Sequence, residues 1–174
     1  VGDFILEIGP GMGALSIPIS EFFNNKIKYT VIEIDSRLID FLKSKLKNKS
    51  IDIINADFLL FDIPEYHSSF NKEKKIRFIG NLPYNISSPI LFKLLNFREL
   101  VEDQFLMLQE EVVDRIVASP NNSNFGRISV MMQAYYYMEK ILDINPNSFF
   151  PAPKVNSSLL KMTPKKFKEK EIID

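Results

Sequence analysis

The chain has 174 residues, of which 45% are hydrophobic and 25% charged, and its 22 basic and 22 acidic residues give a formal net charge of zero; it has no cysteine. This composition fits one globular domain with a sizeable core, and it excludes a second full domain, a disulfide framework and a thiolate metal site. No apolar run approaches the roughly 18 residues that span a bilayer, and no export signal is present, so we expect a cytoplasmic protein without a membrane segment.

Short β-rich runs alternate with stretches of helical period along the chain, which is the pattern of βαβ units around a mostly parallel sheet and indicates the α/β class. The first strand is expected at 4–8, and a helix opened by glycines follows to about residue 24. The loop between them reads Glu7-Ile8-Gly9-Pro10-Gly11-Met12-Gly13. Because glycine has no side chain, a ligand can approach this backbone closely at the carboxyl edge of the sheet. The binding candidates in this nucleotide-type loop are Glu7, Gly9 and Gly11.

A carboxylate marks the end of the second strand, which is expected at 29–34. Glu33 lies 24 residues after Gly9, where it can accept hydrogen bonds from both ribose hydroxyls of an adenosine-bearing cofactor. The next helix is expected at 36–47, with Ser36 as its N-cap.

A second carboxylate, Asp57, follows the third strand, expected at 51–54. It can accept from an adenine amino group while the ring of Phe58 or nearby aliphatic side chains, Ile34 among them, cover the base. An NAD fold also pairs a glycine turn with an acidic residue about 20 residues later. The order acidic-x-Gly-x-Gly-x-Gly and the second carboxylate favour S-adenosylmethionine.

The segment Gly80-Asn81-Leu82-Pro83-Tyr84 follows a fourth strand, expected at 76–79 after a polar surface connection at 65–75. An adenine amino nitrogen is a poor nucleophile because its lone pair is delocalised, so a protein can add positioning and polarisation. The side-chain oxygen of Asn81 and the carbonyl of Leu82 can each accept one amino hydrogen. Pro83 fixes the turn, and Tyr84 offers a flat face to a base taken out of its helix. These four residues are the catalytic candidates.

The remaining elements are expected as a helix at 87–96, a strand at 104–108, a helix at 109–118, a loop at 119–124, a helix at 128–138 and strands at 141–144 and 158–162. The last two strands flank a proline-bearing loop and are expected to form a closing hairpin. Tyr135, Tyr136 and Tyr137 are assigned to a half-buried helix. His67, the only histidine, lies in a polar segment that favours a surface role, and we expect no metal site. We divide the chain into a domain at 1–164 and a lysine-rich tail at 165–174.

Several segments together resemble the KsgA family of ribosomal RNA adenine dimethyltransferases, and the resemblance covers nearly the whole chain. They are the glycine loop, Glu33, Asp57, Gly80-Asn81-Leu82-Pro83-Tyr84-Asn85-Ile86-Ser87, Leu108-Gln109-Glu110-Glu111-Val112-Val113-Asp114-Arg115, Gly126-Arg127-Ile128-Ser129-Val130 and Phe149-Phe150-Pro151-Ala152-Pro153-Lys154-Val155. The resemblance implies a Rossmann-like class I methyltransferase fold, with a mostly parallel seven-stranded sheet, helices on both faces and a C-terminal antiparallel hairpin. It also implies S-adenosylmethionine as the cofactor.

By this resemblance, the contacts to S-adenosylmethionine come from Gly9, Glu33, Asp57 and Asn81. Asn81 also touches the target amino group, Tyr84 and Phe149 sandwich the flipped adenine, and Gly126-Arg127 lies near RNA. The product in this family is dimethyladenosine at two adjacent adenosines near the 3′ end of small-subunit ribosomal RNA. The expected partner is this RNA within an immature small ribosomal subunit, and we expect the protein to act as a monomer.

We expect the chain to be a fragment that lacks the N-terminal segment and the small helical C-terminal domain of complete family members. Asn156 stands where many members have aspartate. One alternative is an Erm-type enzyme that acts on large-subunit RNA, but the continuation Asn85-Ile86-Ser87-Ser88-Pro89 and the loop Pro151-Ala152-Pro153-Lys154-Val155 favour the small-subunit enzyme. Another is a non-catalytic RNA-binding or transcription factor on the same fold, against which the intact cofactor set argues. From the glycine loop alone, a dehydrogenase that uses NAD also stays open.

Overall fold

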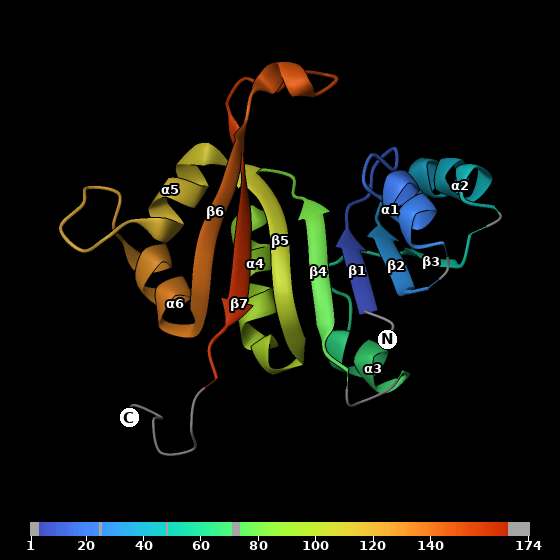
Figure 1. Cartoon of the computed structure of the whole chain (residues 1–174), viewed down its shortest axis with the longest axis horizontal. Coiled ribbons are helices and arrows are strands. Elements are labelled where there is room, and N and C mark those ends of the chain that lie inside the picture. Colours follow the sequence, from blue (N-terminus) through green and yellow to red (C-terminus); the bar gives the residue numbers. More distant parts are fainter. Residues whose placement is uncertain (1–3, 25, 48, 71–73, 167–174) are drawn as a thin grey trace.

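The chain folds around a seven-stranded sheet with strand order β3-β2-β1-β4-β5-β7-β6 (Figure 1). The computed structural model describes residues 4–24, 26–47, 49–70 and 74–166. The strands are β1 (Phe4–Ile8), β2 (Lys28–Glu33), β3 (Ile51–Asn55), β4 (Ile76–Asn81), β5 (Val101–Gln109), β6 (Tyr136–Ile144) and β7 (Ser157–Pro164). Neighbouring strands from β3 to β5 pair in parallel, whereas β7 pairs antiparallel with both β5 and β6. The predicted α/β fold with a closing antiparallel hairpin is confirmed.

Helices cover both faces of this sheet. They are α1 (Ser16–Phe23), α2 (Ser36–Lys45), α3 (Ile63–Ser68), α4 (Ser87–Asn96), α5 (Glu110–Val117) and α6 (Arg127–Tyr135), with short 3₁₀ turns η1 (Arg98–Leu100) and η2 (Pro146–Ser148). Because successive strand residues face opposite sides, Leu6 packs in one core cluster with Ile90 of α4, and Ile5 packs in another with Ile19 of α1. Helix α4 lies behind the sheet in Figure 1. None of the described helices is long and apolar enough to cross a membrane.

The start of the first helix and the N-cap of the second helix differ from the prediction. Helix α1 begins at Ser16 rather than directly after the first glycines, because Gly9, Gly11 and Gly13 all adopt positive φ angles that no α-helix allows. The N-cap of α2 is Asp35, whose side chain accepts from the Arg37 N–H, and the predicted cap, Ser36, is the first helical residue.

The predicted surface connection at 65–75 contains part of a helix. The side chain of Asp62 accepts from the Glu65 N–H at 2.8 Å and caps α3. Ile63 and His67 both face the core, with 0% and 8% of their surface exposed. The surface role predicted for His67 was therefore wrong: its Nε2 lies 2.7 Å from the carbonyl of Lys74 and ties the helix to the approach of β4.

The predicted helix at 128–138 covers the end of one helix and the start of a strand. Helix α6 ends at Tyr135, and β6 then starts at Tyr136, five residues earlier than the strand predicted at 141–144. Tyr136 is buried and Tyr137 is exposed, which is the two-residue alternation of a strand rather than the period of a helix. Strand β7 ends at Pro164. The predicted tail covers residues 165–174, and residues 167–174 lie outside the described part of the chain.

Gly80 allows β4 to lie close against β1 just before the Asn81 motif. A Cβ atom built at this position would lie 2.6 Å from the backbone carbonyl oxygen of Ile8. We therefore expect Gly80→Ala to lower the free energy of unfolding by about 1–3 kcal/mol, as overpacking does. Gly126→Ala is the comparison variant: nothing lies within 4 Å of a Cβ there, so its cost is limited to the weaker N-cap that alanine gives α6. Urea unfolding of both variants measures the difference, and equal stabilities would contradict the close approach.

Candidate active site

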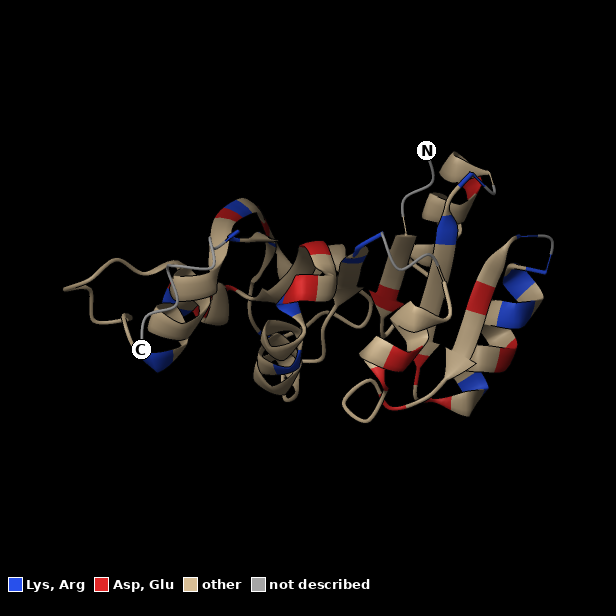
Figure 2. Ribbon diagram, turned by 90° about the horizontal axis from the view of Figure 1, so that it is seen from below, with Lys and Arg blue, Asp and Glu red and all other residues tan. Residues whose placement is uncertain are grey.

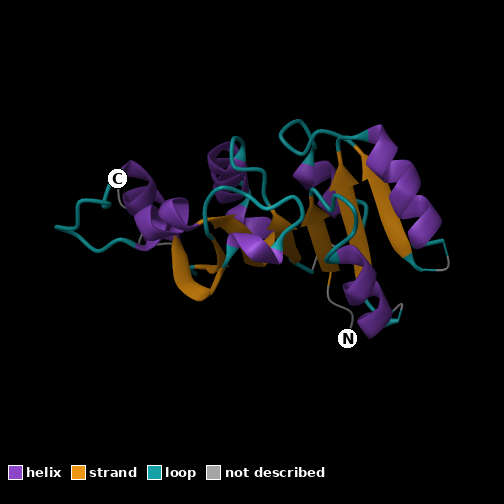
Figure 3. Ribbon diagram, turned by 90° about the horizontal axis from the view of Figure 1, so that it is seen from above, coloured by secondary structure: helices purple, strands orange, loops and turns teal. Residues whose placement is uncertain are grey.

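The predicted binding residues gather at the carboxyl edge of the parallel strands. Figure 3 looks at the molecule from this edge, where the loops that follow the strands lie over the sheet. Glu33 ends β2, Asn81 ends β4, and the glycine loop and Asp57 follow β1 and β3. Side chains and backbone from four neighbouring strands therefore meet at one edge, as expected for a ligand site of an open α/β sheet.

The glycine loop presents an open backbone surface. The Gly9 N–H donates to the carbonyl of Ile32 at 2.9 Å, which fixes the loop to the end of β2. The φ angles of Gly9 and Gly11 are +64° and +57°, and nothing lies within 4 Å of a Cβ built at either residue. A larger residue would fill this space, so the loop has room for a ligand against its backbone. Gly13 instead packs closely against Leu42 and Ile17.

Glu33 is held in a defined position. Its Oε1 accepts from the N–H groups of Ile34 and Asp35 at 2.9 and 3.0 Å, and its Oε2 accepts from the Gly11 N–H at 3.1 Å. The residue is only 6% exposed. A carboxylate has about four acceptor positions, so these three donors orient the group and leave it capacity to accept from a ligand. The carboxylate also ties the glycine loop to β2.

Asp57 and its neighbours form the next part of the edge. The Oδ1 of Asp57 accepts from the Leu59 N–H at 2.8 Å. The Phe58 ring points into the core, where its centre lies 6.1 Å from that of Phe78 and 5% of the residue is exposed. This ring is therefore not available to cover a base. Ile34 is 67% exposed. Of the two predicted ways to cover a base, an aromatic ring or an aliphatic side chain, only the aliphatic one is left.

Glu7, at the end of β1, is buried rather than in contact with open space. It is 1% exposed, accepts from the Ser16 hydroxyl at 2.6 Å, and also accepts from the Tyr29 hydroxyl. Burial raises the pKa of Glu7, and the hydrogen bonds from Ser16 and Tyr29 act in the opposite direction. The sequence suggests Glu7 as a cofactor-binding residue, but in the structure its buried carboxylate joins β1 to α1 and β2.

The segment that follows the exposed Asn81 is anchored at several points. The Leu82 N–H donates to the carbonyl of Met107 in β5 at 3.1 Å, and the Leu82 side chain is 1% exposed. The hydroxyl groups of Tyr84 and Ser157 lie 3.1 Å apart, and the Ser87 hydroxyl donates to the Tyr84 carbonyl at 3.1 Å. Ser157 was not identified from the sequence, where nothing distinguished this serine from others in the last strand.

A cleft of about 370 Å³ joins the glycine loop to the segment after β4, and neither Glu33 nor Asp57 lines it. Its lining is formed by Gly9, Gly11, Asn81, Leu82, Pro83, Tyr84, Phe149, Pro151 and Pro153. Phe149 reaches the cleft from the loop between β6 and β7, far along the chain from the glycine loop. Pro151 and Pro153, which belong to the loop that resembles the family, also line the cleft, although the sequence did not single them out as site residues. Within the described residues, no group of three or more potential metal ligands is found.

Comparison with known proteins identifies the class and then the family. The architecture is that of class I methyltransferases. Residues 2–174 match the family model for ribosomal RNA adenine dimethylase, and the chain belongs to this family. A ribosomal RNA small subunit methyltransferase A from Francisella tularensis subsp. novicida is 46% identical over 168 residues, which is 96% of this chain and 62% of that protein. The family and fold predicted from the sequence are confirmed, and so is the cofactor of the class, S-adenosylmethionine.

Two solved structures agree with this assignment. A dimethyladenosine transferase from Plasmodium falciparum is 30% identical, with a TM-score of 0.80, and the match covers 94% of this chain and 56% of that one. The 23S rRNA methyltransferase ErmE is 26% identical, with a TM-score of 0.78, and the match covers 94% of this chain and 62% of that one. The chain thus spans less than two thirds of the length of these relatives.

Proposed function

We propose that residues 1–164 form a methyltransferase domain that transfers methyl groups from S-adenosylmethionine to the exocyclic amino groups of two adjacent adenosines near the 3′ end of small-subunit ribosomal RNA. The product is dimethyladenosine. The observation that carries the proposal is the cleft, because it places the open glycine backbone and Asn81 on one surface. The substrate is the RNA of an immature small ribosomal subunit, and the protein acts in the cytoplasm as a monomer.

The carboxyl edge of the sheet fits the cofactor. Gly9 and Gly11 leave an open backbone, against which the amino-acid part of S-adenosylmethionine is held. The Glu33 carboxylate accepts from the ribose hydroxyls at the acceptor positions that its backbone donors leave free. Asp57 accepts from the adenine amino group, and Ile34 covers the base. The bound cofactor supplies an electrophilic methyl group on sulfonium. The protein's own task is to hold a weak nucleophile in line with that methyl.

The segment after β4 holds the target. The Asn81 side-chain oxygen and the Leu82 carbonyl each accept one hydrogen of the adenine amino group, which directs the nitrogen lone pair toward the methyl. Tyr84 and Phe149 line the same cleft and enclose the flipped base between two rings. Stacking of this kind contributes about 1–3 kcal/mol per base in nucleic-acid binders. Pro83 keeps the turn rigid, since its φ is fixed.

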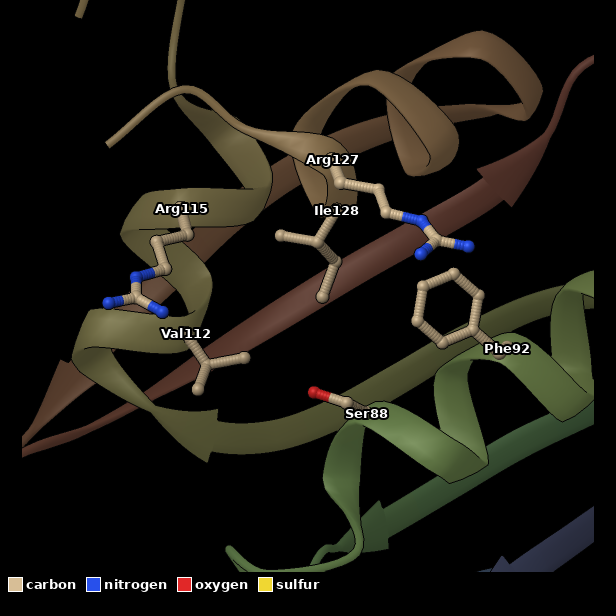
Figure 4. A pocket seen from close by; sticks show the side chains of 6 residues that line it. All are labelled: Ser88, Phe92, Val112, Arg115, Arg127 and Ile128. Atoms are coloured by element: carbon tan, nitrogen blue, oxygen red, sulfur yellow. The ribbon is translucent and has the colours of Figure 1, made fainter. Parts of the chain in front are cut away.

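A pocket of about 370 Å³ between α4, α5 and α6 supports RNA binding (Figure 4). Ser88 and Phe92 of α4 lie on one side, and Arg115 and Arg127 lie on the other. Arg115 is paired with Glu111 at 2.7 Å. Arg127, at the start of α6, has no ion-pair partner among the residues that the structure describes. Since basic and acidic residues are interspersed elsewhere along the ribbon (Figure 2), such local positive charge is what can meet phosphate.

Arg127→Gln is expected to weaken binding of small-subunit RNA. The slope of log binding constant against log salt concentration should fall by about 1, because one phosphate contact is lost. Lys43→Gln, on the exposed face of α2, is the control and should leave the slope unchanged. Filter binding across a salt series measures both variants, and an unchanged slope for Arg127→Gln would remove this residue from the RNA surface.

The proposed reaction is tested by transfer of labelled methyl from S-adenosylmethionine to immature small ribosomal subunits, with large subunits in parallel. Label recovered as dimethyladenosine in small-subunit RNA is the expected result. Label in large-subunit RNA alone would favour an Erm-type enzyme, for which the 26% identity to ErmE is weaker support than the 46% identity to the small-subunit enzyme. Cofactor binding without transfer to either RNA would favour a non-catalytic RNA-binding protein.

A further inference from the structure

Lys93 of α4 reaches across to the loop that carries Asp57. Its Nζ donates to the carbonyl of Leu59 at 2.9 Å and to the carbonyl of Phe61 at 2.6 Å. The same nitrogen lies 5.6 Å from the centre of the Phe58 ring. The side chain therefore makes three contacts with a segment more than 30 residues earlier in the chain. Charge-assisted hydrogen bonds of this kind are roughly twice as strong as neutral ones.

The other hydrogen bonds of this loop are made to β2 or within the loop. The Ala56 N–H donates to the carbonyl of Glu33 at 3.0 Å, and the Leu59 and Leu60 N–H groups donate to the Asp57 side chain and carbonyl at 2.8 and 3.0 Å. These bonds shape the turn. The bonds from Lys93 instead fix the turn to α4, which begins at Ser87, three residues after Tyr84.

Burial and nearby negative charge have opposite effects on the ammonium group of Lys93. Burial lowers the pKa of Lys93, while the nearby charges of Asp57 and Asp62 act in the opposite direction. Cation–π contact with the Phe58 ring adds to the same attraction. Removing the ammonium would leave the two carbonyls without these donors, which is costly for partly buried groups.

We propose that Lys93 is a positioning residue for cofactor binding, which holds the loop at 57–61 so that Asp57 meets the adenine ring. It acts through Asp57 and does not touch the cofactor. By the same contacts it couples the cofactor loop to the helix that follows the target-base motif. This inference rests on the proposed function, because it takes the adenine site beside Asp57 as given.

The test is binding of S-adenosylhomocysteine, measured by calorimetry and without any turnover. Lys93→Met keeps the length of the side chain and removes its donors, and we expect the affinity to fall about tenfold. Lys93→Arg keeps charge and donors and should stay within about threefold of the unchanged chain. Lys43→Met, on exposed α2, is the matched control and should bind normally. Thermal unfolding shows whether each variant folds. If Lys93→Met does not fold, Lys93→Gln is used in its place.

A double-mutant cycle with Asp57→Ala separates positioning from a general structural role. If Lys93 acts through Asp57, the double variant should bind no more weakly than Asp57→Ala alone. Additive losses would overturn the proposal, and so would equal affinity of Lys93→Met and the unchanged chain. Failure of the unchanged chain to bind S-adenosylhomocysteine would instead overturn the proposed function itself.

Discussion

Asn81→Ala is expected to lower kcat for methyl transfer by about 10²–10³-fold, the range seen when one preorganised polar group is removed from a transition-state site. The side-chain oxygen is the group that accepts from the target amino nitrogen, and alanine has no replacement for it. The fold should stay intact, because Asn81 is exposed and β4 is paired on both sides, with β1 and β5. Single-turnover transfer to small-subunit RNA measures the effect.

Asn85→Ala is the matched control for this change. Asn85 is also an exposed asparagine and lies only four residues further along the same segment, but it does not line the cleft. It should keep near-normal turnover. Asn81→Asp retains an acceptor oxygen and should lose less activity than Asn81→Ala. Normal turnover of Asn81→Ala would contradict the mechanism.

The second large effect is expected at Glu33. Glu33→Ala removes the acceptor for the ribose hydroxyls and also for the N–H groups of Gly11, Ile34 and Asp35. Hydrogen bonds to a charged group contribute about 1.5–3 kcal/mol each, so the affinity for S-adenosylhomocysteine should fall about 10²-fold or more. Calorimetry measures this loss directly.

Glu21→Ala, on the exposed side of α1, is the control for Glu33 and should bind normally. Glu33→Gln keeps one acceptor oxygen and should lie between the alanine variant and the unchanged chain. Unchanged affinity of Glu33→Ala would count against its role at the ribose. A loss of affinity that is matched by unfolding would show that the carboxylate matters chiefly as an anchor of the glycine loop.

Much of the fold followed from local pattern. The strand at 4–8 and the helix at 87–96 have the bounds predicted, because apolar runs and turn residues mark both ends clearly. The helix over 63–68 was missed because it is short and its few apolar residues stand among polar ones, although Asp62, Pro64 and Glu65 are signals for a helix start. The end of α6 was missed because the tyrosines there fit a helix and a strand equally well, and only pairing with β7 decides between them.

The backbone positions of the candidate site were predictable from the sequence. Glycines after a strand indicate a loop that a ligand can approach, and carboxylates at strand ends lie at the carboxyl edge of the sheet. Side-chain direction was not predictable. Phe58 and Asp57 are adjacent in the sequence, but the ring turns into the core. Tertiary partners were equally hidden, since nothing in the sequence pairs Tyr84 with Ser157 or Lys93 with the carbonyls of Leu59 and Phe61.

The insertion of β7 between β5 and β6 makes the site depend on parts of the chain that are synthesised far apart in time. The cofactor side is formed by residues up to Asp57, which fold on β1, β2 and β3, whereas Phe149 and Ser157 belong to the last hairpin. Leu6 of β1 shares one core cluster with Leu160 and Met162 of β7, and a single domain generally folds as a unit. The enclosure for the target base therefore exists only after β7 has entered the sheet, so a ribosome must deliver the chain through β7 before any adenine can be held.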